Sequence, residues 1–408
     1  MDADAIIVGG GAAGGTLALA LAQGGLRSVV VDPAPPPETP LGGERPFDGR
    51  AYSVAHGSQR LLRALGLWER LAAEAEPILH IKVADGRPGR GPTSPVLHFD
   101  HAEIEEGPMG WMVEARHLAH ALDAAMAAEP RVTRLRGEVA AQETDAHEAR
   151  VTLASGATLR ARAILGADGR AGGTARRAGI DRSVGDYAQA SITCAVAHER
   201  PHGGTAYQLF LPSGPLAILP LGGRRSAVVW TEARREAERL VGLPDDAFLD
   251  ALRPRFGAFL GALRLVGERG VQPLSLVLAS RLVARRVALV GDAAHGVHPV
   301  AGQGLNAGLR DVAALAEALT EARRRGEDVG EAAALGAYQR WRRFDAALTA
   351  ASTDAFARLF SNDNPLLRGL RGAGLGAVAR IPALRRAFIR EAAGLTGDLP
   401  RLMRGEAL

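Results

Sequence analysis

Cysteine is almost absent from this sequence, since Cys194 is the only one in 408 residues. A single thiol excludes a disulfide framework and any metal site built from several cysteines. Lysine is equally scarce: Lys82 stands alone, so the net charge of +4 comes from arginine. No nucleic-acid-binding motif accompanies this small positive excess, and we expect no nucleic-acid partner.

Long apolar runs are also missing. No stretch reaches the roughly 18 consecutive apolar residues that a membrane-spanning helix needs. The first residues, Met1 to Asp4, are acidic where a secretion signal would be basic, so we expect no signal peptide and a cytoplasmic location. Hydrophobic residues nevertheless make up 47% of the 408 residues, which suits two intertwined domains with a sizeable core, followed by a tail.

A glycine-rich motif lies at the start of the chain. Residues 5–8 are apolar and predict a strand, and Gly9, Gly11 and Gly14 follow in the GxGxxG pattern. A helical pattern and a second apolar strand at 29–31 come next, ending in Asp32, where an acidic residue binds a ribose hydroxyl. A bare GxGxxG is weak evidence, but strand, glycines, helix, strand and acid in this order predict a dinucleotide site. The motif alone does not separate NAD from FAD.

The second informative stretch is residues 287–311, VALVGDAAHGVHPVAGQGLNAGLRD. It predicts a buried strand at 287–290 ending in Gly291-Asp292, a shaped loop, and a helix beginning near Leu305. Open α/β sheets bind ligands at the carboxyl ends of their strands, and the first turn of a helix offers free N–H groups to an anionic group. A lone Gly-Asp pair would more often be a turn capped by its carboxylate; the loop glycines and the N-terminal motif favour a binding site.

Patterns in the rest of the sequence predict the helices, strands and loops around these motifs. A proline-rich loop covers residues 33–48. A helix is expected to begin at 48–53, which includes Arg50. Another helix is expected over 111–128, and an apolar strand that starts at residue 164 is expected to end in the pair Asp168-Gly169. Short strands dominate 181–275, with helix only near 232–260, whereas 331–408 is helical and basic.

The order and spacing of the three strand-end motifs resemble those of the group A flavoprotein monooxygenases, aromatic hydroxylases of the p-hydroxybenzoate hydroxylase type. The resemblance is closer to the ubiquinone-biosynthesis hydroxylases. It is carried by residues 291–311, 210–217 (FLPSGPLA), 112–118 (MVEARHL) and 397–403 (GDLPRLM). It covers nearly the whole chain and implies an FAD- and NAD(P)H-dependent monooxygenase.

The implied fold is α/β, with a Rossmann-like FAD-binding domain interleaved with an antiparallel β-sheet substrate domain and followed by C-terminal helices. The expected boundaries are 1–75, 99–180 and 276–345 for the FAD-binding domain, 76–98 and 181–275 for the substrate sheet, and 346–408 for the C-terminal segment.

The resemblance also implies roles for individual residues. The glycines let the FAD pyrophosphate approach the first helix, Asp32 holds the adenosine ribose, and Asp292 binds the ribityl chain. The implied cofactor-binding positions are Gly9, Gly11, Ala12, Ala13, Gly14, Asp32, Arg50, Ala51, Arg116, Val139, Asp168, Gly169, Gly291, Asp292, Pro299, Gly302, Gln303, Gly304, Leu305 and Asn306. One departure puts the nicotinamide contact in doubt: Gly172 and Ala175 stand where the family has a serine and an arginine, and Arg176 or Arg177 is the candidate replacement.

The implied chemistry belongs to the cofactor. NAD(P)H reduces FAD, the reduced flavin reacts with O2, and a flavin C4a-hydroperoxide hydroxylates an electron-rich ring. The positions implied to face flavin and substrate are Pro299, Gly302, Leu305 and Asn306, with no side-chain base among them. His295 and His298 are alternative proton donors, although loop packing is the commoner role for such residues. Tyr187, Tyr207 and Cys194 are expected to form core or cavity wall. No metal is expected, because none of the eleven histidines shows ligand spacing with carboxylates.

Several functions remain open on the sequence alone. The leading one is hydroxylation of a lipophilic prenylated phenol on the way to ubiquinone, with partner proteins of that pathway. The alternatives are a prenyl reductase, a hydroxylase of another small aromatic, and a non-catalytic flavin-binding scaffold. A plain NAD dehydrogenase explains neither Asp292 nor the loop after it. The oligomeric state is not predicted.

The C-terminal segment raises the question of a membrane. Between residues 365 and 404 there are eight arginines against Glu391 and Asp398, interleaved with apolar residues. A basic amphipathic segment binds anionic lipid surfaces, and a polyprenyl substrate resides in the bilayer. We therefore expect peripheral contact with the inner face of the plasma membrane. The alternative, that the segment packs on the FAD-binding domain with its arginines in water, is equally compatible with the sequence.

Overall fold

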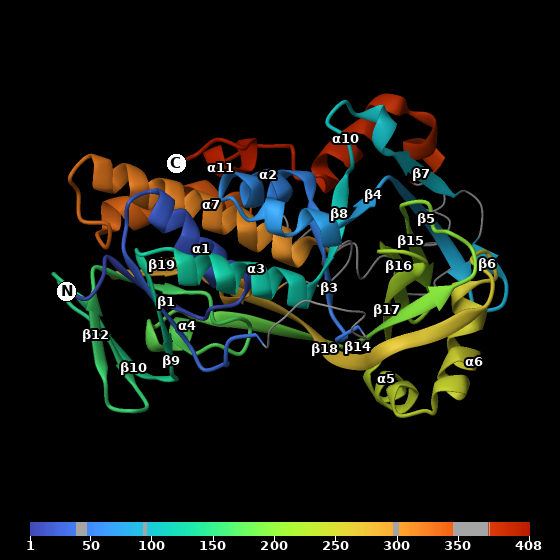
Figure 1. The fold of residues 1–408 in the computed structure, drawn as a ribbon, viewed down its shortest axis with the longest axis horizontal. Helices are drawn as coiled ribbons and strands as arrows, with labels where there is room; N and C mark the ends of the chain where they lie inside the picture. Colours follow the sequence, from blue (N-terminus) through green and yellow to red (C-terminus); the bar gives the residue numbers. More distant parts are fainter. Residues whose placement is uncertain (38–46, 93–95, 297–301, 346–373, 375) are drawn as a thin grey trace.

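The computed structural model describes residues 1–37, 47–92, 96–296, 302–345, 374 and 376–408 (Figure 1). Within these residues no helix combines the length and the apolar composition needed to cross a bilayer. The two halves of the molecule have different architectures, as the sequence predicts.

A mostly parallel sheet forms the core of one half (Figure 1). Its described strands follow the order β19-β20-β13-β1-β2-β9, and neighbours run parallel except β19 and β20. These strands are β1 (Ala5–Val8), β2 (Ser28–Asp32), β9 (Val132–Arg136), β13 (Ala163–Gly166), β19 (Val283–Ala284) and β20 (Val287–Leu289). The predicted strands of the three ligand-binding motifs are therefore confirmed, and they lie side by side as β2, β1, β13 and β20.

Alternate residues of this sheet face two different layers. Ile7 and Val30 pack among helices α1 (Ala12–Gln23), α3 (Ala115–Ala128) and α7 (Gln303–Arg324). Ile6 and Val31 pack instead against a three-stranded antiparallel sheet. That small sheet consists of β10 (Val139–Thr144), β11 (Ala149–Leu153) and β12 (Thr158–Ala161). Both faces of the parallel sheet are thus buried, which explains why its strands are apolar throughout.

The other half is built on a large, mainly antiparallel sheet, ordered β21-β18-β14-β17-β16-β15-β5-β6 with β7 paired to β5. Its strands are β5 (His80–Arg87), β6 (Gly91–Pro92), β7 (Leu97–Asp100), β14 (Arg182–His198), β15 (Thr205–Leu211), β16 (Gly214–Leu221), β17 (Arg225–Ala233), β18 (Leu263–Ala279) and β21 (His295–Gly296). The long strands β14 and β18 run from one half of the molecule into the other (Figure 1). The sheet extends a few residues past the expected limits at 98 and 275, and the division into discontinuous domains stays a prediction.

One face of the large sheet is covered by α5 (Arg234–Val241) and α6 (Asp245–Phe256). Trp230 of β17 and Phe248 of α6 are fully buried there, with ring centroids 5.9 Å apart. The opposite face is turned toward the cavity described below.

Two expected helix starts are wrong. Residues 51–55 form strand β3 (Ala51–Ala55) and residues 110–114 form strand β8 (Gly110–Glu114), which pair with each other in antiparallel register. The helices begin only afterwards, as α2 (His56–Ala64) and α3. Local periodicity cannot detect this, because the backbone hydrogen bonds of each strand are satisfied by a partner distant in the sequence. A third strand, β4 (Glu76–Ile78), also pairs with β8.

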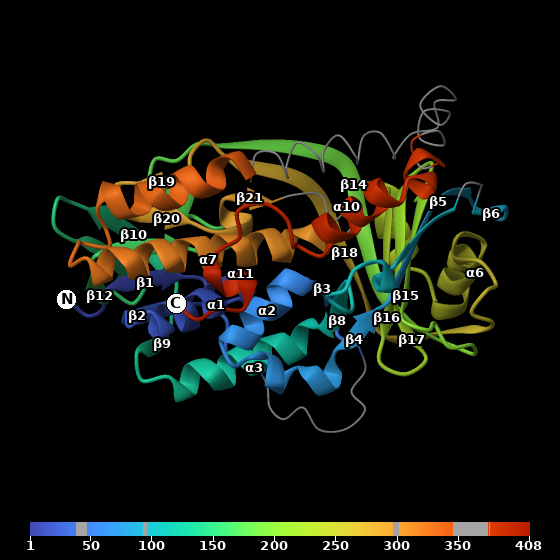
Figure 2. The same cartoon turned by 90° about the horizontal axis from the view of Figure 1, so that it is seen from above.

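The C-terminal part returns to both halves. Residues 332–345 are helical, α10 (Pro382–Ala392) lies beside β7 and β8, and α11 (Arg401–Arg404) contacts α2 and α7 (Figures 1 and 2). Leu402 and Met403 are buried, and the Arg401 N–H donates to Glu317 at 2.7 Å. The end of the tail therefore packs on the parallel-sheet half. Short turns complete the described chain: η1 (Trp68–Arg70), η2 (Ala72–Glu74), η3 (His101–Glu103), α4 (Thr174–Arg177) and η4 (Gly291–Ala293).

Candidate active site

A cavity of about 1860 Å³ connects the two halves. It begins at the carboxyl ends of β2 and β9, passes the N-termini of α1 and α7, and ends on the large sheet, where strands from β5 to β18 line it. Pockets for drug-sized ligands measure roughly 300–1,000 Å³. This cavity therefore has room for a dinucleotide and a second molecule.

The three motif glycines have two different functions. A Cβ on Gly9 would lie 2.5 Å from the Ala167 carbonyl oxygen, and one on Gly14 would lie 1.8 Å from the Gly9 oxygen, so these two positions allow close packing of β1, α1 and β13. Neither of them lines the cavity. Gly11 does line it, and a Cβ there would meet nothing within 4 Å. With Ala12 and Ala13, Gly11 presents the positive end of α1 to the cavity, which suits a phosphate.

Asp32 lies at the end of the cavity beside β9. Its carboxylate accepts the N–H of Gly10 at 2.5 Å and that of Ala34 at 2.8 Å, which fixes its orientation at the cavity wall. Arg134 and Arg136 of β9 line the same end, although the sequence analysis did not single them out. The only signal for them was their place at the end of a strand parallel to β2.

Asp292 lies at the middle of the cavity and pairs with Arg170, whose Nε is 2.9 Å from its Oδ2. Arg170 also donates to the Ser275 carbonyl at 3.1 Å, so it ties the Gly-Asp turn to the long strand β18. Arg170 was not predicted from the sequence, although it directly follows Asp168-Gly169. Gly169 and Gly291 line the cavity as expected.

Asp168 itself does not line the cavity within the described structure. Its Oδ2 accepts from the backbone N–H and the hydroxyl of Thr174, at 2.9 and 2.7 Å. A Cβ on Gly172 would lie 2.1 Å from the Asp168 carboxyl carbon. The glycine that departs from the family pattern is thus required by the turn that Asp168 holds. The structure gives Asp168 a role in holding this turn, and its expected contact with the cofactor stays a prediction.

The N-terminus of α7 is shaped by Gly302 and Asn306. Gly302 adopts a left-handed conformation, with φ of +65°, directly before the helix. The Asn306 amide accepts the Ala55 N–H at 2.9 Å and donates to the carbonyls of Ser53 and Gly302 at 2.9 and 3.1 Å. Its side chain therefore holds the start of α7 against β3, with the N-terminus of the helix at the cavity wall. Residues 302–306 all line the cavity. Pro299 and His298 lie outside the described residues.

Four further expected positions differ in their surroundings. Arg50 and Ala51 line the cavity, and Arg50 is exposed. Arg116 lines it as well, and its guanidinium pairs with Glu114 at 2.8 Å, a carboxylate that also pairs with Arg225 at 3.2 Å. Val139 packs in the core between the two sheets and is not part of the described lining, and its expected cofactor contact stays a prediction.

His295 does not face the cavity. It is buried under the Gly-Asp turn, with its Nε2 2.5 Å from Asp311 Oδ2. Burial alone would lower the pKa of His295, but the charge and hydrogen bond of Asp311 outweigh burial and raise it. Arg342 donates to the other Asp311 oxygen at 2.8 Å. These partners overcome the effect of burial on Asp311 and lower its pKa to about 2. The packing role is thus the one the structure supports for His295.

The end of the cavity on the large sheet is mainly apolar. Ile81, Val83, Leu97, Phe99, Phe210, Ala217, Leu219 and Val229 line it. Ser191 and Gln272, opposite each other on β14 and β18, also line it, and the buried Ser191 hydroxyl has no hydrogen-bond partner within the described residues. Tyr207 reaches the lining and packs on Phe259, with ring centroids 4.4 Å apart. Cys194 is buried on the other face of β14, where burial raises the pKa of its thiol to about 12.

The site is closed by residues of the C-terminal segment. Phe388, Ile389 and Ala392 of α10 line the cavity next to Phe99. An ion pair between Arg385 Nε and Glu103, at 2.7 Å, fastens α10 to η3. The contribution of this segment to the cavity was not foreseen from the sequence.

Comparisons with known proteins agree with this arrangement. Residues 2–350 match the family model described as FAD binding domain. The chain is 47% identical to ubiquinone hydroxylase UbiL of Rhodospirillum rubrum, over 100% of this chain and 94% of that protein. It is 34% identical to the 3-demethoxyubiquinol 3-hydroxylase of Escherichia coli, over 95% and 98%. Its fold is similar to p-nitrophenol 4-monooxygenase PnpA from Pseudomonas putida, with a TM-score of 0.77, 20% identity and coverage of 97% and 98%.

Proposed function

The chain belongs to the FAD-binding domain family and is an FAD-dependent monooxygenase, and from that premise we propose that it hydroxylates the ring of a polyprenylated phenol in ubiquinone biosynthesis. The observation that supports this most is the single cavity joining the N-termini of α1 and α7 to an apolar sheet face. Two relatives with ubiquinone-pathway names cover nearly all of the chain.

The residues of the cavity fit FAD. Gly11 leaves open space at the start of α1, which lies between Asp32 on one side and Asp292 on the other. In our proposal the α1 N-terminus holds the pyrophosphate, Asp32 the adenosine ribose and Asp292 the ribityl hydroxyls. When bound, FAD supplies hydride acceptance from NAD(P)H and the activation of O2.

The protein's own contribution would be electrostatic and steric. In our proposal the backbone N–H groups of Leu305 and Asn306, at the positive end of α7, favour negative charge on the flavin ring edge that lies against them. Arg170 keeps Asp292 in place, and Asn306 holds the helix end against β3. Phe388 and Ile389 of α10 would exclude water from the apolar end.

The apolar end suits a prenylated ring. Its walls offer apolar surface to the prenyl chain, and the Ser191 hydroxyl is a buried polar group that a phenol oxygen can satisfy. We therefore assign Ser191 as the group that orients the ring. Gln272, its cross-strand neighbour, is the second polar contact.

The lipid solubility of such a substrate calls for an approach from a membrane. Helix α10 exposes Leu384 and Phe388, and the residue before it, Ile381, is exposed as well; the exposed fractions are 37%, 47% and 49%. Phe388 also lines the cavity, so this exposed stripe is continuous with the apolar end. We propose that the stripe rests on the inner face of the plasma membrane and that the prenyl chain enters beside it.

The test is a turnover experiment under ¹⁸O2 with the FAD-loaded enzyme, NAD(P)H and a prenylated phenol. The proposal expects NAD(P)H consumption and one ¹⁸O atom in the ring of the product, detected by mass spectrometry. A product reduced in its prenyl chain would identify a reductase instead. A yellow protein that never oxidises NAD(P)H would identify a flavin-binding scaffold.

A further inference from the structure

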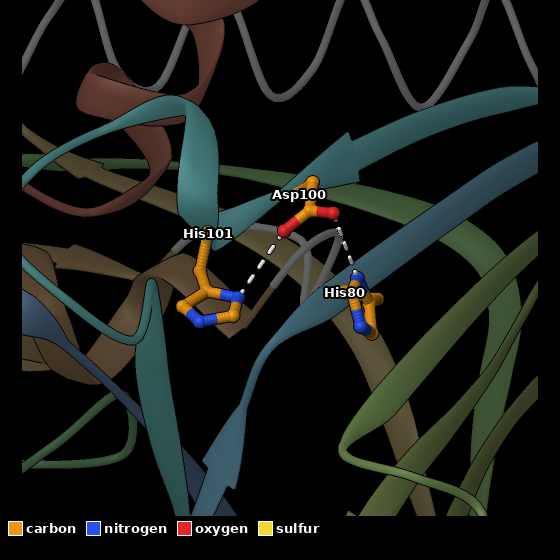
Figure 3. A group of neighbouring side chains, drawn as sticks. All are labelled: His80, Asp100 and His101. Carbon is orange, nitrogen blue, oxygen red and sulfur yellow. Dashed lines mark ion pairs between the residues drawn. The ribbon is translucent and has the colours of Figure 1, made fainter.

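A group of ligand-type side chains lies on the large sheet, away from the cavity. His80 of β5 and Asp100 of β7 are opposite each other in antiparallel register, and His101 follows in η3 (Figure 3). Their strand neighbours Ile81 and Phe99 line the cavity. Because side chains alternate along a strand, His80 and Asp100 project from the other face. Helices α5 and α6 cover that face elsewhere, but these three side chains remain about one-third exposed, with fractions of 31%, 34% and 31%.

The distances within the group suit one metal ion. His80 Nδ1 lies 3.6 Å from Asp100 Oδ2, and His101 Nδ1 lies 3.2 Å from Asp100 Oδ1. Ligand atoms of all three residues lie within 4.8 Å of one another. Around a tetrahedral zinc ion with bonds of about 2.0–2.1 Å, neighbouring ligand atoms are roughly 3.4 Å apart. Small side-chain rotations would therefore bring all three ligands onto one ion.

The surroundings also favour a ligand set. The Ala102 N–H donates to Asp100 Oδ1 at 2.9 Å and fixes the carboxylate between the two rings. His101 Nδ1 lies 3.1 Å from the Leu79 carbonyl, which also accepts the His101 backbone N–H at 2.9 Å. A metal ion could thus take the ring nitrogen without leaving that carbonyl unsatisfied. His98 Nε2 lies 3.3 Å from His80 Nδ1 and supplies a further imidazole beside the group.

We propose that His80, Asp100 and His101 bind a divalent transition-metal ion of the zinc type. Two imidazole nitrogens and one carboxylate oxygen are a ligand set typical of such ions, whereas Mg²⁺ and Ca²⁺ prefer oxygen ligands alone. The site lies on the face of the sheet opposite the cavity, so the ion has no part in the oxygen chemistry.

The bound ion would stiffen the cavity wall. It would link β5 to β7, the two strands that contribute Ile81, Val83, Leu97 and Phe99 to the apolar end. The same turn, η3, carries Glu103, which holds Arg385 of α10. A metal ion at His101 would therefore also anchor the attachment of the helix that closes the cavity.

The experiment is calorimetric titration of the FAD-loaded, chelator-treated enzyme with Zn²⁺, repeated with Mg²⁺. The expected result is one saturable Zn²⁺ site per chain, no comparable Mg²⁺ binding, and a Zn²⁺-dependent rise in Tm. Asp100→Asn is the sharpest variant, because asparagine keeps the oxygen that accepts the Ala102 N–H and remains a good capping residue while losing the charge. His80→Ala removes one ring. Both variants should lose the site and the Tm rise while retaining FAD.

His147→Ala is the matched control, since His147 is an exposed histidine in the β10–β11 turn of the other half. It should bind Zn²⁺ like the unsubstituted chain. The proposal is overturned if the unsubstituted chain shows no saturable Zn²⁺ binding, or if Asp100→Asn and His80→Ala bind as well as His147→Ala. Flavin content and monooxygenase activity are separate readouts, so a failure here leaves the proposed function untouched.

Discussion

The buried carboxylate of Asp311 accepts the backbone N–H of Gly291 at 3.0 Å, across a separation of 20 residues. The same carboxylate binds His295 and Arg342, and Asp345 joins Arg342 to Arg310. Gly291 directly precedes Asp292, the carboxylate in the middle of the cavity. The position of Asp292 therefore depends on a charged network that lies beneath the cavity and does not line it.

Replacing Asp292 and replacing Asp311 should have separable effects. Asp292→Ala removes a partly exposed cavity carboxylate, so FAD binding should weaken by about 1.5–3 kcal/mol, the range for hydrogen bonds to charged groups, with little change in apoprotein stability. Asp311→Ala removes the buried carboxylate that His295 and Arg342 share and should cost about 3–5 kcal/mol of folding free energy as well. Flavin titration and urea unfolding of both variants measure the two effects. Equal stability of the two variants would refute the buried network as the support of the turn.

The network also predicts how stability depends on pH. The pKa of Asp311 is lowered from 3.8 to about 2, so its contribution is present above pH 4 and lost as pH falls toward 2. The pKa of His295 is raised above 6.5, so its contribution is complete below pH 6.5 and lost as pH rises through the raised value. The ion pair should therefore stabilise the apoprotein most between pH 4 and pH 6.5. Urea unfolding across pH should show a flatter profile for His295→Gln than for the unsubstituted chain; identical profiles would contradict the assignment.

The two glycines Gly11 and Gly14 form a matched pair of tests. Gly11→Val should abolish flavin binding without lowering the Tm of the apoprotein, because its Cβ would enter open cavity space. Gly14→Val should destabilise the fold itself, because its Cβ would collide with the Gly9 carbonyl. Absorbance at flavin wavelengths and thermal unfolding measure both outcomes. Full flavin occupancy in Gly11→Val would disprove the phosphate-binding assignment.

The parts of the site that could be predicted from the sequence are those encoded by adjacent residues. In the unit from Ala5 to Asp32, and in the strand, turn and helix from Val287 onward, apolar periodicity marks the elements and glycines mark where they end. Arg170, β3 and the Asp311 network depend on partners brought close only by folding, and they were missed. The same applies to His80 and Asp100, whose pairing across two strands is invisible to spacing along the chain. The only local sign was the run His98-Phe99-Asp100-His101.

Ser191→Ala should change stability and substrate binding in opposite directions. Removing a buried hydroxyl that has no partner should leave the apoprotein equally stable or more stable by up to about 1 kcal/mol. Losing its hydrogen bond to the phenol should raise KM by a factor corresponding to about 0.5–1.5 kcal/mol. Flavin reduction by NAD(P)H without substrate should be unaffected. An unchanged KM would remove Ser191 from the substrate site.

Binding of α10 to a membrane can be tested without disturbing the fold. Deleting the whole segment from residue 365 would remove α11, whose Leu402 and Met403 are buried, and would confuse binding with unfolding. The exposed stripe offers a cleaner change: Ile381→Ser with Leu384→Ser should reduce co-sedimentation with anionic vesicles while leaving flavin content intact. Phe388 is left unchanged because it also lines the cavity.

Electrostatic attraction should contribute less to membrane binding than the number of arginines in the C-terminal segment suggests. Arg385, Arg390 and Arg404 are paired with Glu103, Glu106 and Glu406. Arg380 and Arg386 flank the apolar stripe. Each arginine near an anionic surface adds about 1 kcal/mol, and salt screens this term.

Arg380→Gln with Arg386→Gln should therefore lower binding at low salt to the value that the unsubstituted enzyme shows at high salt. The apolar part of the membrane binding, which the serine substitutions test, should be the same at both salt concentrations. Equal binding to neutral and anionic vesicles would contradict the electrostatic part, and absence of binding to either would show that α10 serves only to close the cavity.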